Sequence, residues 1–155
     1  MMEFNMVSVK MLESRNANES MANLFMGQLM PLYQEYWQNK ARGIYNEPFN
    51  VQMQALVNLW FNGSIKIFIA TDNDIVVGFC IALVYRPIAY NNTVFQIQDF
   101  YVRPNNTEAR EKLIGLLMDS TLILNCNEIQ SSEPLDLPNW TEMPDIITKR
   151  YKIGV

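Results

Sequence analysis

The chain has 155 residues, of which 49% are hydrophobic and 18% charged, a composition that predicts one globular domain over residues 1–155. Its formal net charge of −4 argues against a nucleic-acid-binding protein, because such proteins neutralise phosphates with clustered Lys and Arg. No apolar run approaches the length of a membrane span, and the first residues lack the basic and apolar regions of a signal peptide, so we expect no membrane association.

The histidine and cysteine content narrows the chemistry further. The chain has no histidine, so the commonest general base and metal ligand is absent. Any proton transfer must therefore use a carboxylate, Tyr, Lys, Cys or water. Cys80 and Cys126 fall in apolar stretches without metal-ligand or redox spacing, which predicts reduced core thiols, no metal site and a cytoplasmic protein.

The first part of the chain predicts one strand and two helices. Residues 6–12 form a short strand, and apolar residues over 21–37 then fall on one helical stripe. Because Pro31 lies inside this stripe, we expect a kink or break there. A second helix is predicted between the cap residue Asn50 and Gly63.

Three runs of β-branched and aromatic residues follow. They predict antiparallel strands over residues 65–71, 75–85 and 93–103. The first two runs are separated by Asp72-Asn-Asp74, a turn composition that predicts a hairpin.

The last third predicts a crossover connection. A helix over residues 108–123 precedes a short strand over 125–130. We therefore expect this strand and the strand at 94–102 to be parallel neighbours that splay apart at their C-terminal ends. A short helix near 145–149 and a terminal strand through Tyr151 complete the prediction.

Two of the predicted strands carry a family resemblance. One contains Val77-Gly-Phe-Cys-Ile-Ala82, and the next contains Gln98-Asp-Phe-Tyr-Val102 and leads through a polar turn into a helix. Together with the element order, these segments resemble the GNAT N-acetyltransferase superfamily, and within it the polyamine-type enzymes. The resemblance implies an α/β (α+β) fold with a mixed, mostly antiparallel central sheet and helices on both faces. A plain antiparallel sheet could supply both segments by β-propensity alone.

The resemblance implies acetyl-CoA as the cofactor. In the family, backbone groups that match Phe100, Tyr101 and Val102 pair with pantetheine, and backbone amides of the following loop bind the pyrophosphate at a helix N-terminus. The residues that match this loop are Glu108, Ala109, Arg110, Glu111 and Lys112. Both loop glycines are missing. The two acids oppose a diphosphate and the two basic residues favour it, although acids in a first helical turn capped by Thr107 are also explained by the helix dipole.

Asp99 and Tyr151 are the catalytic candidates. The family's carboxylate that deprotonates the amine matches Gln98, which cannot accept a proton, and Asp99 follows it. Adjacent strand residues face opposite sides, so Asp99 does not simply inherit the task, and a buried or edge carboxylate held by backbone or Tyr hydrogen bonds is the other interpretation. Tyr151 loosely resembles the tyrosine that protonates the departing thiolate, with a packed strand tyrosine as the alternative.

The acceptor pocket would be shaped by the first two helices and their connection. The aromatic residues in this part of the chain are Tyr33, Tyr36, Trp37, Tyr45 and Phe49. An aromatic stripe on a helix is more often core than pocket. Glu35, Glu47 and Asp99 would hold a cationic amine if they converge.

Two functions of different classes follow. The first is an acyl-CoA-dependent N-acetyltransferase that transfers an acetyl group to a small amine or a protein amine. The alternative is a catalytically silent protein of the same fold, used for binding or assembly with a protein partner or as a homodimer. The high Asn count and small size suggest a phage protein for this alternative.

Overall fold

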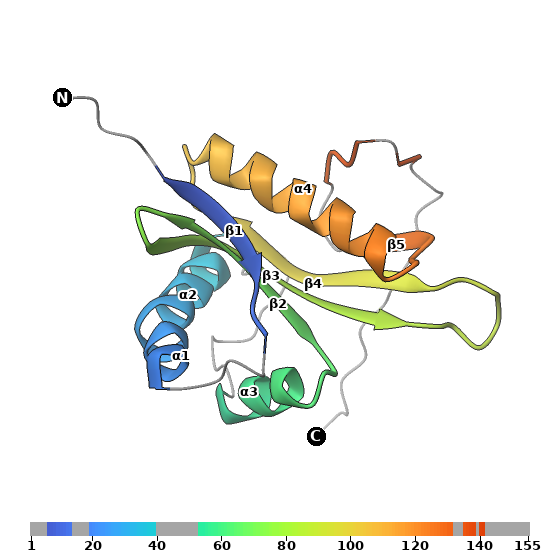
Figure 1. Ribbon diagram of the computed structural model, residues 1–155, viewed down its shortest axis with the longest axis horizontal. Coiled ribbons are helices and arrows are strands. Elements are labelled where there is room, and N and C mark those ends of the chain that lie inside the picture. The colour runs from blue at the N-terminus through green and yellow to red at the C-terminus, as the bar shows by residue number, and fades with distance from the viewer. Residues whose placement is uncertain (1–5, 14–18, 40–52, 132–134, 139, 142–155) are drawn as a thin grey trace, which may run out of the picture.

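The computed structural model describes residues 6–13, 19–39, 53–131, 135–138 and 140–141, which form one sheet flanked by helices (Figure 1). The strands are β1 (Val7–Met11), β2 (Lys66–Asp72), β3 (Ile75–Tyr85), β4 (Val94–Val102) and β5 (Glu128–Ser131). The helices are α1 (Glu19–Leu24), the π-helical turn η2 (Phe25–Leu29), α2 (Met30–Asn39), α3 (Met53–Phe61) and α4 (Thr107–Ile123). The helix predicted near 145–149 and the strand predicted through Tyr151 lie outside the described residues.

The order of strands across the sheet follows their order in the chain. β1 to β4 pair as antiparallel neighbours, and the β2–β3 turn holds Asn73 and Asp74 at φ of 51° and 68°, the left-handed region that tight hairpins need. β5 pairs in parallel with β4, with Val94 opposite Glu128, and α4 forms the crossover between them. The predicted hairpin and the predicted parallel pair are both confirmed.

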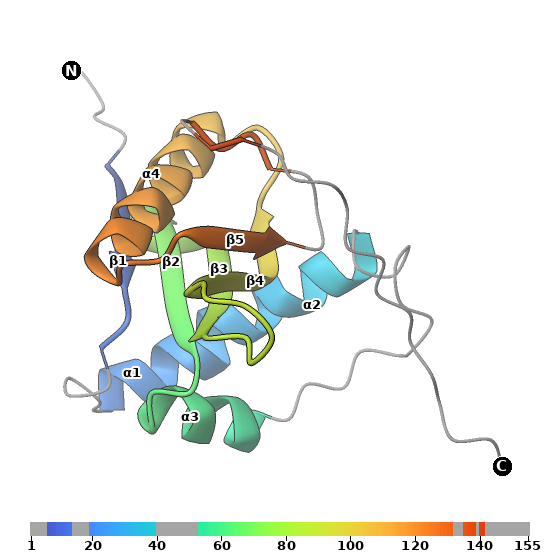
Figure 2. The same ribbon diagram turned by 90° about the vertical axis from the view of Figure 1, so that its right-hand side faces the viewer.

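The helices divide between the two faces of the sheet. α4 covers one face, and α1, α2 and α3 lie against the other (Figures 1 and 2). The apolar layer under α4 includes Phe68, Cys80, Phe95, Phe100, Leu113 and Leu117. The layer under the other helices includes Phe25, Leu29, Leu32, Tyr36, Trp60, Phe79 and Tyr101. The predicted mixed, mostly antiparallel sheet with helices on both faces is therefore confirmed.

A π-helical turn directly before Pro31 interrupts the α-helix, at the place where a kink or break is expected. Proline has no N–H, and its ring crowds the carbonyl group four residues earlier, which here belongs to Gly27. The turn before it widens, and the Met30 N–H donates to the carbonyl oxygen of Phe25, five residues back. Within this turn, the side chain of Gln28 accepts a hydrogen bond of 2.8 Å from the Val76 N–H, which ties the helix to β3.

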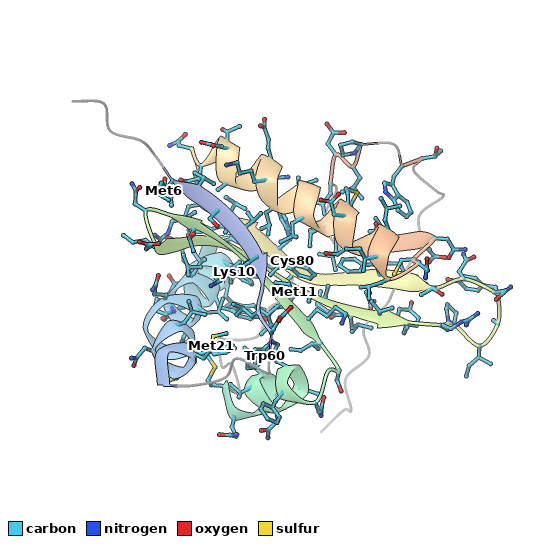
Figure 3. All side chains as sticks on the ribbon, in the orientation of Figure 1. Met6, Lys10, Met11, Met21, Trp60 and Cys80 are labelled. Atoms are coloured by element: carbon cyan, nitrogen blue, oxygen red, sulfur yellow. The ribbon has the colours of Figure 1, made fainter. Side chains whose placement is uncertain are left out.

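α3 is attached to the edge of the sheet through Trp60. The Trp60 indole N–H donates to the Leu12 carbonyl oxygen at 3.0 Å, just beyond the end of β1 (Figure 3). Both residues are buried, so this bond satisfies two polar groups that are shielded from water. Within the described part of the chain, none of the helices has the length and apolar character needed to cross a membrane.

Gly78 sets how closely β3 and β4 approach. A Cβ atom at this position would lie 2.8 Å from Val102 Cγ2 and 3.2 Å from the Tyr101 carbonyl oxygen. We expect Gly78→Ala to lower the free energy of unfolding by about 1–3 kcal/mol, because the two strands must separate to admit the methyl group. The measurement is chemical denaturation followed by circular dichroism.

Gly115→Ala is the matched control for Gly78→Ala. No atom lies within 4 Å of the added Cβ on α4, and alanine has the higher helix propensity, so stability should rise by up to about 1 kcal/mol. Equal effects of the two substitutions would contradict the close approach of β3 and β4.

Candidate functional site

One edge of β4 is only half covered. β5 pairs with β4 from Val94 to Ile97, and the last pair is Ile97 with Ser131. On the other side, β3 continues to pair with β4 as far as Val102. Residues 98–102 therefore form an open edge, which has no strand partner on the β5 side within the described residues.

The alternation of backbone groups along β4 decides which of them face the open edge. The Arg103 N–H donates to the Val77 carbonyl oxygen on β3 at 2.9 Å. Because antiparallel pairing alternates from residue to residue, the N–H and C=O groups of Tyr101 also point to β3, whereas those of Phe100 and Val102 point away from it. Two of the three predicted pantetheine-pairing residues thus present backbone groups at the open edge.

A β-bulge in β4 changes the phase of its side chains. Asp99 pairs with Ile81 and Ile97 pairs with Ala82, so Gln98 is the extra residue. Before the bulge, the odd-numbered residues Phe95 and Ile97 face α4. After it, the even-numbered residues Phe100 and Val102 do so, which means that the alternation has shifted by one residue. The strict alternation assumed for Gln98 and Asp99 is therefore wrong across the bulge.

The bulge directs Asp99 toward α2. The Tyr33 hydroxyl group donates a hydrogen bond to Asp99 Oδ2. Burial raises the pKa of the Asp99 carboxyl, while hydrogen bonds from Tyr33 and Tyr36 act to lower it. Burial, followed by the charge of Asp99, raises the pKa of the nearby Cys80 thiol far above its ordinary value, so this thiol stays protonated. The site thus contains a partly buried carboxylate that accepts hydrogen bonds from tyrosine hydroxyl groups.

Polar and aromatic residues of α2 also contact β4 and the residue that follows it, beyond Asp99. Arg103 Nε lies 3.1 Å from Glu35 Oε2, which forms an ion pair between α2 and the residue after β4. The Tyr33 and Tyr36 rings pack on Phe79 with centroids 5.0 and 5.9 Å apart. Glu35, which would help to hold a cationic amine only if it converged with Asp99, is instead paired with Arg103.

The turn into α4 contains an asparagine in a left-handed conformation. Asn105 has φ of 70°, a left-handed conformation that asparagine tolerates better than most residues. Asn106 is the N-cap, and its carbonyl oxygen accepts a hydrogen bond from the Arg110 N–H at 3.0 Å. The expectation that Thr107 caps the helix is wrong, because Thr107 is already its first helical residue.

The five predicted loop residues separate onto different sides of α4. Glu108 and Lys112 form an ion pair of 3.3 Å, and Lys112 Nζ donates to the Val7 carbonyl oxygen of β1 at 3.1 Å. Ala109 is buried against the sheet, and Glu111 is exposed. Arg110 lies over the Phe100 ring, 5.1 Å from its centroid. Arg110 thus places a positive charge over Phe100, a residue of the open edge.

Not all of the predicted site residues can be placed in the structure. Tyr45, Glu47, Phe49 and Tyr151 lie outside the described residues. The Tyr33–Asp99 hydrogen bond agrees with the interpretation of Asp99 as a carboxylate held by Tyr hydrogen bonds. The bulge was not predicted, although the adjacent polar residues at 98 and 99 between apolar runs are a signal for one. Among the described residues, no cluster of Cys, Asp and Glu is arranged to hold a metal ion.

This architecture is the fold of the GNAT acetyltransferases. An aminoglycoside acetyltransferase from an uncultured soil metagenomic sample, crystallised with sisomicin, aligns at a TM-score of 0.69 and 14% identity, covering 96% of this chain and 97% of that chain. A ribosomal-protein-alanine N-acetyltransferase from Brucella melitensis biovar Abortus 2308 aligns at a TM-score of 0.59 and 16% identity, covering 92% of this chain and 100% of that chain. A predicted acetyltransferase with acetyl-CoA from Clostridium acetobutylicum aligns at a TM-score of 0.57 and 14% identity, covering 90% of this chain and 96% of that chain. No family model and no curated protein sequence matches the chain.

The raised pKa of Asp99 predicts a pH-dependent effect on stability. In the unfolded chain an Asp carboxyl has a pKa of about 3.9, and in the folded protein the pKa of Asp99 is higher. As pH rises from the first pKa through the second, ionisation of Asp99 lowers the free energy of unfolding of the wild type. Asp99→Asn removes this cost and keeps an oxygen that can accept from Tyr33. We therefore expect the free energy of unfolding of the variant, relative to wild type, to increase between pH 4 and pH 8 in urea titrations.

Asp119→Asn, on the exposed side of α4, is the control for removing one negative charge. A difference between Asp99→Asn and wild type that stays constant or decreases with rising pH would contradict the burial of an ionised Asp99.

Proposed function

We propose that this protein is an acyl-CoA-dependent N-acetyltransferase that acts on a small amine or a protein amine. The proposal rests on one observation: β5 leaves β4 after Ile97, so that the backbone groups of Phe100 and Val102 are open beside the N-terminus of α4 and next to a carboxylate, Asp99. The similar solved structures that act on aminoglycosides or on a protein alanine support an amine acceptor of either kind.

The residues of the open edge fit an acetyl-CoA thioester. Backbone groups of Phe100 and Val102 would pair with the amide groups of the pantetheine arm, as an added strand does. The first-turn amides of α4 have no intrahelical acceptors and would bind the diphosphate together with Arg110. The ion pair with Lys112 offsets the negative charge of Glu108 near this helix end. The left-handed Asn105 lets the chain turn from β4 into α4.

Asp99 is the proposed general base. Bound acetyl-CoA supplies the acetyl group as an activated thioester. Asp99 would accept a proton from the acceptor ammonium, directly or through water, and free the nitrogen lone pair. The nitrogen would then bond to the thioester carbonyl carbon as the carbon–sulfur bond breaks, with sulfur keeping the electron pair and the nitrogen releasing its second proton to water. We keep Tyr151 as the proposed donor of the proton that this sulfur takes up.

The buried, unpaired thiols fit the same proposal. Cys80 and Cys126 are both free and buried, which suits a reducing compartment. We propose a cytoplasmic location, where acetyl-CoA would be supplied as substrate.

Calorimetric titration with CoA tests the proposed cofactor site. We expect wild type to bind with Kd below about 100 μM, which corresponds to about −5.5 kcal/mol. Arg110→Gln should weaken binding about tenfold, because it removes the cation next to Phe100, and added salt should reduce this difference. Lys10→Gln makes the same charge change on the exposed edge strand β1 and should leave the affinity unchanged. Equal losses in the two variants, or no binding by wild type, would count against the site.

Acetyl transfer to a panel of amines and amino-terminal peptides tests the proposed base. Asp99→Asn should lower kcat/KM by about 10²- to 10⁴-fold, the usual contribution of a positioned base. Asp119→Asn is again the charge control and should retain wild-type rates. Turnover that survives in Asp99→Asn would remove Asp99 from the mechanism. Absence of turnover in wild type, with CoA still bound, would favour a silent binding protein.

A further inference from the structure

Tyr33 occupies a defined place in the site because its ring is held on two sides. It packs on Phe79 of β3 at a centroid distance of 5.0 Å and on Tyr36 of its own helix at 6.1 Å. Its hydroxyl group donates to Asp99 Oδ2, while Asp99 itself is fixed by the bulge of β4. We infer that Tyr33 is a positioning residue that keeps the Asp99 carboxylate in the orientation and charge state needed for proton transfer. This inference rests on the proposed function.

The groups around Asp99 explain why such a donor is needed. A carboxylate that loses its hydration requires hydrogen bonds or a cation to remain ionised. From α2 it is faced by the neutral hydroxyl groups of Tyr33 and Tyr36, and its pairing partner on β3 is the apolar residue Ile81, whereas Cys80 lies on the α4 side of the sheet. Arg103, the residue after β4, is paired with Glu35 of α2. Neutral donors therefore stabilise the charge, and they leave the carboxylate able to take up a proton.

A cation in contact with Asp99 would act differently. Direct pairing with Arg would lower the pKa of the carboxyl strongly and weaken it as a base. Burial raises the pKa of Asp99, and the Tyr33 hydrogen bond acts against that increase, so the two effects oppose each other. Removal of the Tyr33 hydroxyl group leaves the effect of burial less opposed, and a larger fraction of Asp99 should then be protonated near neutral pH.

Tyr33→Phe isolates the hydroxyl group, because phenylalanine keeps the ring that packs on Phe79 and Tyr36. Tyr85→Phe is the matched control, since it removes a tyrosine hydroxyl group that donates to Gln130 at the other end of β3. The first measurement is a carbon-detected NMR titration of the Asp99 carboxyl group in the whole protein, which requires no turnover. We expect its midpoint to move to higher pH in Tyr33→Phe and to stay at the wild-type pH in Tyr85→Phe.

The second measurement is the pH dependence of kcat/KM for acetyl transfer. Tyr33→Phe should move the acidic limb in the same direction as the NMR midpoint, with about a tenfold loss on that limb and recovery at higher pH. An unchanged NMR midpoint would overturn the inference whether or not the protein is an enzyme. If it is an enzyme, a loss of kcat/KM that is equal at every pH would also overturn it. A moved midpoint without turnover in wild type would overturn the proposed function, and with it the use of this pair in catalysis.

Discussion

The arrangement of the whole site depends on one extra residue in β4. The bulge at Gln98 shifts the phase of the strand, so that Asp99 and Tyr101 face α2 while Phe100 and Val102 face α4. Without the bulge, regular alternation would turn Asp99 into the apolar layer beneath α4, where its charge would have no hydrogen-bond donor. The same strand can therefore contribute to two apolar layers and still present a carboxylate to the opposite helix.

A second irregularity, in the helix opposite, complements the first. The π-helical turn before Pro31 adds one residue to a helical turn and so rotates all that follows it. Leu32 and Tyr36 become buried, and Tyr33 comes to lie against Asp99. Both irregularities cost regular hydrogen bonds. One lies in β4 and the other directly before α2, the two elements that meet at Asp99. Such departures from ideal geometry are common where a protein must aim a side chain.

The regular part of the architecture was predictable because it follows local rules. Period-two runs and the Asp72-Asn-Asp74 turn define the hairpin, and a helix between two strands defines the parallel crossover. The inward direction of Asp99 was not predicted, because the alternation rule was applied across adjacent polar residues that in fact form a bulge. Nor does residue type alone reveal that Glu108 and Lys112 pair toward β1 while Arg110 contacts Phe100. Those outcomes depend on the angular positions that a helix assigns once it is docked.

The position of β1 at the edge of the sheet has a consequence for assembly of the fold. β2, β3 and β4 are joined by short turns, but Thr71 of β2 hydrogen-bonds to Ser8 of β1, 63 residues away in the chain. Closing a loop of that length costs more chain entropy than closing either hairpin, and the first two helices lie within it. The meander can thus form from local contacts, whereas β1 needs this long loop to close before it pairs, and the hydrogen bond from Trp60 to the Leu12 carbonyl oxygen joins it to α3. The edge of the sheet and the helical layer are in this way completed together.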